Sequence, residues 1–326
     1  MKGYIVREFG GPEVMQFEEL PDPECGADEV VIAVRASGIN FAETRMRAGT
    51  YSGQPLPFVM GMEAAGDVIE VGSAVEGYAV GDRVFGRARG AHAEKVAIHK
   101  DHLLPLPDEL SYVDGAAIPV GWQTAWHALH TVAKIQSGER LIIEAVASSV
   151  GSAGLQIAKA AGAWVAGTAS MDEKLEAAKG WGLDCAINYK AEDMAARVAE
   201  ATGGDWTEGG GCDVGMMTIG QETAEALCAC MANEGRVAMY GSTSGKDITI
   251  NLIIGSQNLA LIGMSISTSP KFVPETMKSF REEAVPLFAQ GKLKPVIAEV
   301  LPLSDLTRAH EMVGERNHFG KIVLEI

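Results

Sequence analysis

The chain is poor in positive charge. It has 27 Lys and Arg against 43 Asp and Glu in 326 residues, a formal net charge of −16. Surfaces that bind a phosphate backbone gather Lys and Arg, so we expect neither nucleic acid nor anionic membrane as a partner. No apolar run approaches the roughly 20 residues of a membrane span. The first residues, Met1 to Arg7, also lack the apolar core of a signal peptide, so we expect a cytoplasmic protein.

Cysteine is scarce and scattered. The five cysteines form an odd set without C-x-x-C spacing, which indicates reduced thiols and fits a cytoplasmic protein. Cys228 and Cys230 fall in a predicted helix from Glu222 to Met231, where residues two apart point to different faces. We interpret them as buried thiols and not as metal ligands.

The chain changes character twice along its length, which is long for one hydrophobic core. Residues 1–118 contain short β-like runs and turns, which predict a compact, irregular β-barrel. Residues 119–266 alternate strands with helices, and the strands are almost wholly apolar, as in a doubly wound parallel sheet. The sequence pattern of residues 267–326 again resembles that of residues 1–118. We therefore predict an α/β protein with a discontinuous first domain, 1–118 and 267–326, around a dinucleotide-binding domain, 119–266.

The strongest local motif lacks the glycines that normally define it. A predicted strand, Arg140 to Ala145, leads through a turn into a predicted helix from Gly151 to Ala161. A G-x-G-x-x-G turn would need glycine at 146 and 148, but the chain has Val146 and Ser148 there. The strand, turn and helix still predict a dinucleotide diphosphate at the helix N-terminus. The candidate residues are Ala147, Ser148, Ser149, Val150 and Gly151.

A carboxylate is also missing from the end of the next predicted strand. NAD-preferring sites have an Asp or Glu there for the ribose 2′-OH, whereas this chain reads Gly167-Thr-Ala-Ser170, with Lys174 one helical turn later. Ser170, Lys174 and Tyr189 are candidates for a 2′-phosphate, so we expect NADPH, with NADH the less favoured cofactor. The alternative is that Lys174 is a solvated charge and Ser170 a helix N-cap. Gly241 and Ser242, after the predicted strand Arg236 to Tyr240, complete the candidate cofactor residues.

Several motifs together resemble the medium-chain dehydrogenase/reductase superfamily, and within it the zinc-free quinone oxidoreductase (zeta-crystallin-like) group. The resemblance spans nearly the whole chain and implies a GroES-like β-barrel domain, a Rossmann domain, an active-site cleft between them and a homodimer. We expect the dimer to form through the Rossmann edge strand near Leu259 to Met264, which would otherwise be exposed. The motifs include Ala36-Ser-Gly-Ile-Asn40-Phe-Ala-Glu-Thr44, Gly61-Met-Glu63-Ala-Ala-Gly66, Gly81-Asp-Arg-Val84 and Gly320-Lys-Ile-Val-Leu324.

The resemblance also bears on zinc. In the zinc alcohol dehydrogenases of this superfamily, the catalytic ligands would fall on Asn40, Met62 and Val120. Met and Val cannot supply the ligands that zinc needs, and Asn is a poor one. Among the seven His, His127 and His130 are three apart on a predicted helix, but packing or surface roles suit them better. We therefore expect no metal.

Without a Lewis acid, hydride transfer from NADPH to an electron-poor acceptor is easier than alcohol oxidation. We expect a small electrophile, a quinone or an α,β-unsaturated carbonyl compound, as substrate. By resemblance, Asn40 and Thr124 would face the nicotinamide and the acceptor. Arg45 stands where the group often has Tyr. We hypothesise that Arg45 stabilises the oxyanion that forms as hydride arrives, the alternative being a solvated Arg on a helix.

Other functions remain open from the sequence. One is an alcohol or enoyl-thioester oxidoreductase of the same superfamily, and another is a non-catalytic dinucleotide-binding or structural protein. Three departures from the group bear on cofactor binding. Ser149 replaces a usual glycine, and Glu144 stands near the end of the first predicted strand of the second domain, where the group tends to have His or a small residue. Met217 replaces a frequent acidic residue at the end of the fourth strand.

Overall fold

The computed structural model describes residues 1–51, 53–245, 247–250 and 256–326. The chain divides into two compact units, which we call the first unit (Met1–Gly121 with Ser279–Ile326) and the second unit (Trp122–Lys278). The architecture confirms the predicted fold class, a GroES-like domain and a Rossmann-like parallel sheet in an α/β chain. The domain boundaries expected from the sequence, at 118 and 266, stay a prediction.

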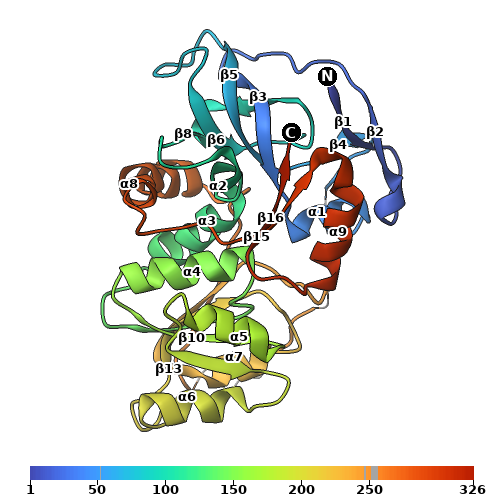
Figure 1. Ribbon diagram of the computed structural model, residues 1–326. Helices are drawn as coiled ribbons and strands as arrows, with labels where there is room; N and C mark the ends of the chain where they lie inside the picture. Colours follow the sequence, from blue (N-terminus) through green and yellow to red (C-terminus); the bar gives the residue numbers. More distant parts are fainter. Residues whose placement is uncertain (52, 246, 251–255) are drawn as a thin grey trace. The chain divides into compact units, whose positions relative to one another are not determined.

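The first unit contains two sheets among its described residues (Figure 1). The C-terminal strand lies beside a strand from the start of the chain, because β16 pairs antiparallel with β3. The small sheet has the order β2 (Met15–Glu19), β1 (Lys2–Val6), β4 (Phe58–Val59). The large one has the order β15 (Ile297–Pro302), β16 (Lys321–Glu325), β3 (Glu29–Gly38), β5 (Glu63–Val71), β6 (Arg83–Arg87), β8 (Leu103–Pro105), and β7 (Lys95–His99) also pairs with β3.

Helix α9 covers part of this unit because its apolar residues follow the helical period. Leu306, Ala309, His310 and Val313 are its buried residues, spaced as one face of a helix requires. That face packs against α1, β15 and β16. The other helices of the first unit are α1 (Phe41–Arg47), α2 (Tyr112–Ala116) and α8 (Val285–Ala289), and α9 itself spans Leu306–Glu315. Short 3-10 turns are η1 (Pro12–Val14), η2 (Lys100–His102) and η7 (Leu303–Asp305), and a π-helix, η6, spans Phe280–Ala284.

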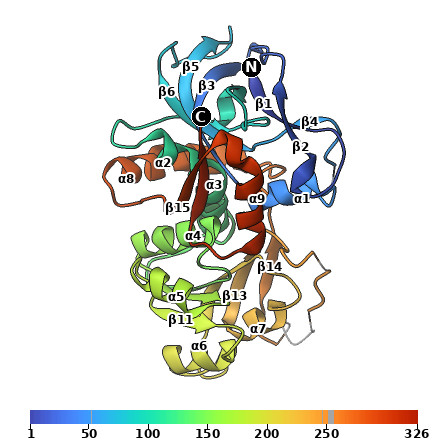
Figure 2. The same cartoon turned by 45° about the vertical axis from the view of Figure 1, so that its right-hand side comes forward.

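The second unit is built on a parallel sheet whose strand order reverses at β9. Helix α4 packs on β9 and β10, and α5 packs on β10 and β11, while α6 contacts β11 and α7 (Figure 2). The order is β11 (Cys185–Asn188), β10 (Trp164–Ala169), β9 (Arg140–Ile143), β12 (Cys212–Met217), β13 (Met231–Met239), β14 (Ala260–Gly263). The helices are α4 (Ser149–Ala160), α5 (Asp172–Lys179), α6 (Met194–Thr202) and α7 (Ala224–Ala229), with π-helices η3 (His127–Val132) and η5 (Phe272–Met277). Helix α3 (Pro119–Trp126) crosses the division of the two units.

The sequence also predicts helices over 116–133 and 274–290. The first is interrupted, because it covers the end of α2, then α3 and the π-helix η3, whereas the second falls within one unbroken helical run that contains η5, η6 and α8. The helix predicted to end at Met231 ends at Ala229, because Met231 begins β13 and pairs with Cys212 of β12. Pairing across the sheet overrides the local helical pattern there.

The described cysteines are all free thiols. Cys228 lies on α7 and Cys230 is the residue that caps it, both buried. Burial raises the pKa of the Cys228 thiol to about 11, which keeps the thiol protonated and unreactive at neutral pH.

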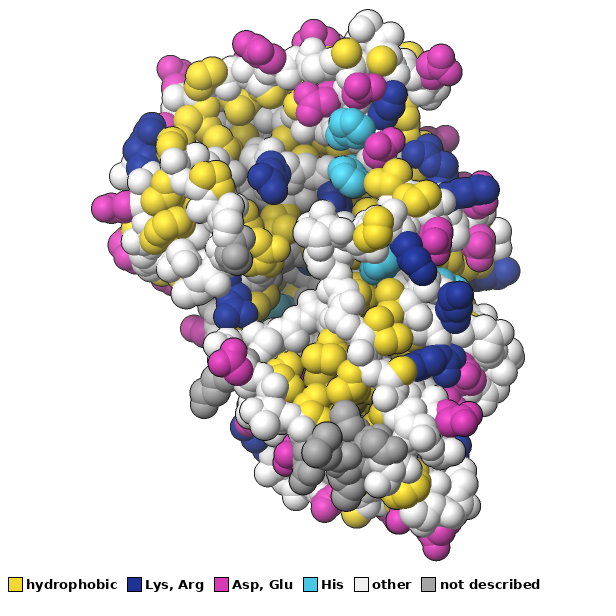
Figure 3. Space-filling model, turned by 180° about the vertical axis from the view of Figure 1, so that it is seen from behind, with side chains coloured by type: hydrophobic (Ala, Val, Ile, Leu, Met, Phe, Trp, Pro, Cys, Tyr) yellow, Lys and Arg dark blue, Asp and Glu magenta, His cyan; other side chains and the backbone are white. Residues whose placement is uncertain are grey.

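The surface mixes charges of both signs. On the face seen in Figure 3, Lys and Arg lie singly or in small groups among Asp and Glu, and the described residues there form no continuous basic patch. Within the part of the chain that the structure describes, no helix has the length and apolar character that a membrane crossing requires.

Candidate functional site

The turn predicted to bind a dinucleotide lies at the carboxyl end of β9, next to the point where the strand order reverses. Open α/β sheets bind their ligands at such a point. Ser148 is the N-cap of α4, and its hydroxyl oxygen accepts a hydrogen bond from the Gly151 N–H at 3.0 Å. The N–H groups of Ser149 and Val150, in the first turn, have no acceptor within the helix. This is an arrangement that binds a phosphate group.

Gly151 is required by the protein's own backbone. A Cβ atom at this position would lie 2.3 Å from the Ala145 carbonyl oxygen and 2.7 Å from Val146 Cα. The glycine therefore lets α4 begin directly against the turn that precedes it. Ala145 has a φ of 51°, in the left-handed region that an alanine rarely adopts, so the turn is tight even without the usual glycines.

The candidate 2′-phosphate residues lie at the same edge of the sheet. Ser170 follows β10 and Tyr189 follows β11, and the two strands pair through Ala169 and Asn188. Ser170 is exposed and Tyr189 is half-buried. Lys174 lies half-buried on α5. The alternative that Ser170 caps α5 is wrong, because Met171 occupies the N-cap position.

Asp172 is the first carboxylate after Ser170 in the sequence. Its Oδ1 atom accepts a hydrogen bond from the Asn188 side chain at 2.7 Å. That bond holds the carboxylate against the end of β11.

Gly241 and Ser242 lie in the loop after β13, also at the carboxyl edge of the sheet. The loop joins the one after β12, since Thr243 N–H donates to the Thr218 carbonyl oxygen at 2.8 Å. All ten candidate cofactor residues thus occur at the carboxyl ends of parallel strands or on the helix or loop that follows each strand.

Glu144 is a buried carboxylate just beyond β9, and it fixes the loop after β12. One oxygen accepts from the N–H groups of Thr218 and Ile219, each at 2.7 Å, and the other accepts from the Thr223 hydroxyl at 2.6 Å. Burial raises the pKa of Glu144, although these three hydrogen bonds act to lower it. Sequence reasoning noted Glu144 only as a departure from the family. Met217, the other departure, ends β12 and is fully buried.

In the first unit, Asn40 precedes α1 and lies in a buried polar network. Its amide nitrogen donates to Glu43 Oε1 at 3.0 Å and to Glu63 Oε1 at 2.8 Å, and its oxygen accepts from Lys321 Nζ at 2.7 Å. Lys321 also forms an ion pair with Glu63, and both side chains are almost fully buried. Both amide hydrogens of Asn40 are therefore used inside the protein.

Two of the three positions that the superfamily uses for catalytic zinc, Asn40 and Val120, donate hydrogen bonds to Glu63. Asn40 donates to one of its oxygens, and the Val120 N–H donates to the other at 2.6 Å. Asn40, Met62 and Val120 offer an amide already in use, a thioether and an aliphatic chain. This donor set does not suit zinc.

The other predicted catalytic residues lie on two helices. Arg45 is half-buried on α1, and its carbonyl oxygen accepts from the N–H groups of Thr50 and Tyr51. Thr124 is buried on α3 and belongs to the second unit, whereas Asn40 and Arg45 belong to the first. Their roles stay a prediction.

His127 and His130 have packing partners within the second unit. His127 Nδ1 lies 2.6 Å from the Thr276 hydroxyl, and its ring meets Phe272 edge-on. His130 stacks on Trp126 with ring centroids 3.9 Å apart, and burial lowers its pKa to about 4.

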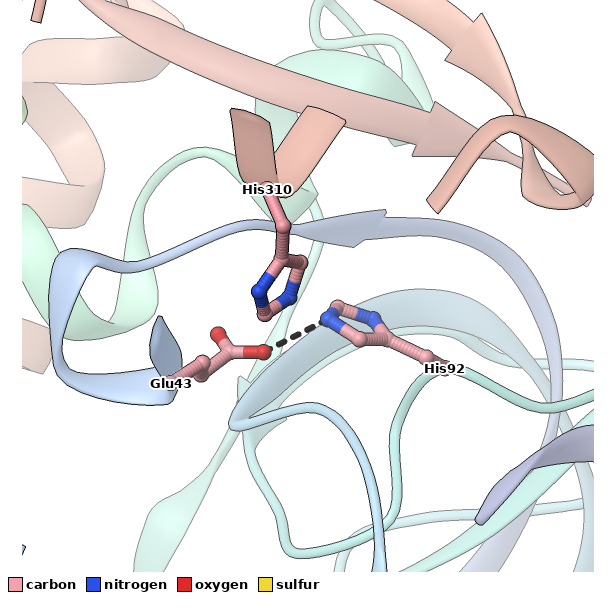
Figure 4. A group of neighbouring side chains, drawn as sticks. All are labelled: Glu43, His92 and His310. Carbon is pink, nitrogen blue, oxygen red and sulfur yellow. Dashed lines mark hydrogen bonds and ion pairs between the residues drawn. The ribbon is translucent and has the colours of Figure 1, made fainter. Parts of the chain in front are cut away.

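Sequence reasoning missed a second buried group in the first unit, formed by Glu43, His92 and His310 (Figure 4). His92 Nε2 lies 2.6 Å from Glu43 Oε2. Burial lowers the pKa of His310 to about 4, so this imidazole is neutral at physiological pH. No local spacing could reveal the group, because its members come from α1, the segment before β7, and α9.

Comparisons with known proteins identify the family of this chain. Residues 26–108 match the family model described as alcohol dehydrogenase GroES-like domain, and residues 149–284 match the one described as zinc-binding dehydrogenase. A quinone oxidoreductase of Pseudomonas aeruginosa is 33% identical, with 97% of each chain covered. The chain belongs to the quinone oxidoreductase group of the medium-chain dehydrogenase/reductase superfamily.

Two further members of this superfamily are similar over nearly their full length. A 2-haloacrylate reductase from a Burkholderia species is 32% identical, covering 98% of this chain and 97% of its own. The solved structure of Escherichia coli quinone oxidoreductase complexed with NADPH has a TM-score of 0.91 and 31% identity, with all of both chains covered. The predicted family membership is confirmed.

Glu144 gives a testable prediction for this member of the group. Glu144→Ala leaves three donors without an acceptor and should reduce the free energy of unfolding by about 3 kcal/mol. Glu144→Gln keeps an acceptor oxygen and should cost far less. Urea denaturation of the two variants and the native chain measures both effects.

The same pair tests the direction of the pKa shift. Because folding raises the pKa of Glu144, its contribution to stability is fully present below its unfolded pKa, about 4.3, and is lost as the pH rises through the folded value. Gln cannot ionise, so the stability of Glu144→Gln relative to the native chain should increase between about pH 4 and pH 7. A constant or decreasing difference would contradict this account.

Proposed function

We propose that this chain is an NADPH-dependent oxidoreductase that reduces a quinone or an α,β-unsaturated carbonyl compound, with no metal ion in the reaction. The observation that carries the proposal is the set of phosphate-binding features at the carboxyl edge of the second unit's sheet, together with the absence of a carboxylate directly after β10. NADPH, once bound, supplies the hydride. The protein binds and orients the cofactor and the acceptor, and it stabilises the charge that develops on the acceptor.

The residues that would hold the cofactor divide by what they offer. The first turn of α4 offers N–H groups and a positive helix end to the diphosphate. Ser148 contributes as well: its oxygen accepts from Gly151, and its own hydroxyl hydrogen can still be donated. Ser170, Lys174 and Tyr189 are the candidates for binding the 2′-phosphate. Gly241 and Ser242, in the loop after β13, are further candidates for contact with the cofactor.

The proposed substrate class follows from a reaction in which no Lewis acid activates the acceptor. Quinones and conjugated carbonyl compounds accept hydride without a Lewis acid, since the negative charge spreads onto oxygen. The Escherichia coli relative is named a quinone oxidoreductase, and the Burkholderia relative a reductase of a haloacrylate, an alkene conjugated to a carboxyl group. Both names fit this substrate class.

Arg45 is the proposed source of positive charge toward the developing oxyanion, and Thr124 a proposed contact of the nicotinamide or the acceptor. Asn40 takes a different proposed role, because both of its amide hydrogens are used by Glu43 and Glu63. It would act by fixing the start of α1, the helix that carries Arg45.

We also propose that two copies associate through β14, the last strand in the order of the second unit's sheet. An exposed strand edge offers unpaired N–H and C=O groups to a second copy. A cytoplasmic location is likewise a proposal, in keeping with the free cysteines.

The function is tested by measuring NADPH consumption with 1,4-benzoquinone, 9,10-phenanthrenequinone and a short enone. Turnover with at least one acceptor is expected, and it should persist after dialysis against a chelator. Tight NADPH binding without turnover on any acceptor would favour the non-catalytic alternative. Activity with primary alcohols and NAD+ only would favour an alcohol dehydrogenase.

Lys174→Ala tests the cofactor preference. If Lys174 binds the 2′-phosphate, the variant should bind NADPH about tenfold more weakly, a loss of roughly 1.4 kcal/mol, and bind NADH as before. Lys179→Ala is the matched control, because Lys179 lies on the same helix and pairs with exposed Glu176. Quenching of tryptophan fluorescence gives the dissociation constants. Equal weakening for both cofactors, or none, would exclude this role.

Arg45→Met tests the oxyanion proposal. Loss of a charge that acts in the transition state should lower kcat and kcat/KM together, by about tenfold or more. Arg7→Met is the control, since Arg7 is exposed and pairs with Glu18 in the same unit. Unchanged kinetic parameters in Arg45→Met would rule out this role.

A further inference from the structure

The buried group of Glu43, His92 and His310 has no role in the proposed reaction. The three side chains come from α1, the segment between β6 and β7, and α9, and they point toward one another (Figure 4). Each is at most 1% exposed. One potential ligand atom from each lies within 4.8 Å of the other two.

A hydrogen bond on one ring nitrogen of His92 orients the other nitrogen toward Glu43, as a metal ligand requires. Its Nδ1 atom lies 2.8 Å from Ser37 Oγ, and the Ser37 hydroxyl donates to the Glu63 carbonyl oxygen at 2.8 Å. A hydroxyl has one hydrogen, so the Nδ1–H of His92 must be the donor to Ser37. The Nε2 atom, which faces Glu43 Oε2 at 2.6 Å, is then the one ring nitrogen of His92 that a metal ion can bind. Such a hydrogen bond on the far nitrogen is the usual support of a metal-binding His.

Glu43 is held in a similar way. The backbone N–H and the side-chain amide of Asn40 both donate to Glu43 Oε1 at 3.0 Å. The second oxygen, Oε2, is directed at His92. A buried carboxylate requires a positive partner. Glu63 has Lys321, whereas among the described residues Glu43 pairs with His92 and with no Lys or Arg.

His310 supplies the independent observation. It is 1% exposed, and neither ring nitrogen has a hydrogen-bond partner within the described part of the chain. An unsatisfied buried polar group is costly, so a native protein normally gives it a partner. A cation between His310, His92 and Glu43 would satisfy the imidazole and the carboxylate at once.

We propose that Glu43, His92 and His310 bind one divalent transition-metal ion, most naturally zinc, as a structural site of the first unit. Two imidazole nitrogens and one carboxylate oxygen are a zinc donor set that leaves the fourth tetrahedral position to a water molecule, whereas magnesium and calcium prefer oxygen alone. With bonds of about 2.1 Å, tetrahedral ligand atoms are about 3.4 Å apart. The side chains need to shift by only about an ångström to reach this geometry.

The proposed site differs from the superfamily's catalytic zinc positions, which fall on Asn40, Met62 and Val120. It also departs from the expectation of a metal-free chain, which rested on the superfamily's zinc positions and on the spacing of His127 and His130. The ion would connect α1, the His92 segment and α9, which come from widely separated parts of the chain. Its effect would therefore be on stability, with no part in hydride transfer.

The first test uses the untagged native protein. After dialysis against a chelator, Zn²⁺ or Co²⁺ should bind with a stoichiometry of one, measured by plasma mass spectrometry after desalting. Bound Co²⁺ should show the intense visible bands of a tetrahedral site. Saturating Zn²⁺ should raise Tm by roughly 5 °C. Stoichiometry well below one, or Co²⁺ with only the weak spectrum of the hydrated ion, would overturn the proposal.

The second test uses His310→Leu. If His310 is a ligand, the variant should lose the bound ion and the rise in Tm. If it is not, replacing an unpartnered imidazole with an apolar side chain should leave stoichiometry unchanged and stabilise the protein. His130→Leu is the control, because His130 is a half-buried histidine of the second unit and its replacement should have no effect on binding. Should His310→Leu fail to fold, Glu43→Gln, expected to weaken binding at least tenfold, replaces it.

Discussion

The buried carboxylate of Glu63, on β5, binds three other parts of the first unit that are far apart in the sequence. It pairs with Lys321 of β16, accepts from the Asn40 amide before α1, and accepts from the Val120 N–H at the start of α3. Gly38 leaves room for the pair, because a Cβ there would lie 2.7 Å from both Glu63 Oε1 and Lys321 Cε. Removing one member of such a pair leaves a charge uncompensated in the interior, which is far more costly than the pair itself.

The second unit also contains a buried carboxylate that binds backbone groups. Glu144 binds two backbone N–H groups and a hydroxyl, and so holds the loop after β12 beside the turn that would receive the cofactor. In both units a buried carboxylate fixes backbone. Glu63 holds the starts of α1 and α3, the helices that carry Arg45 and Thr124. Asn40 belongs to this supporting layer: it joins Glu63 to Glu43 and thereby to the proposed metal site.

Much of the architecture could be predicted from the sequence because local pattern and tertiary role coincide. The second unit has the alternation of strands and helices predicted for residues 119–266, and β14 is the edge strand expected at 259–264. The turn at Ser148 was recognisable from the strand before it and the helix after it. Long-range groups were not predictable: Glu63 and Lys321 occur in separate motifs, and Glu43, His92 and His310 become neighbours only when α9 packs on α1. The π-helices were also missed, because their residues have ordinary helical patterns.

The most direct test of Glu63 as the anchor of the first unit is a double-mutant cycle with Glu63→Gln and Lys321→Met, followed by urea denaturation. Each single variant should lose about 3 kcal/mol or more, because each leaves a buried group of the network without its partner. The double variant should be clearly more stable than the sum of the two losses predicts, with a coupling energy of about 2 kcal/mol. Additive losses would show that the two side chains stabilise the unit independently and would contradict this account.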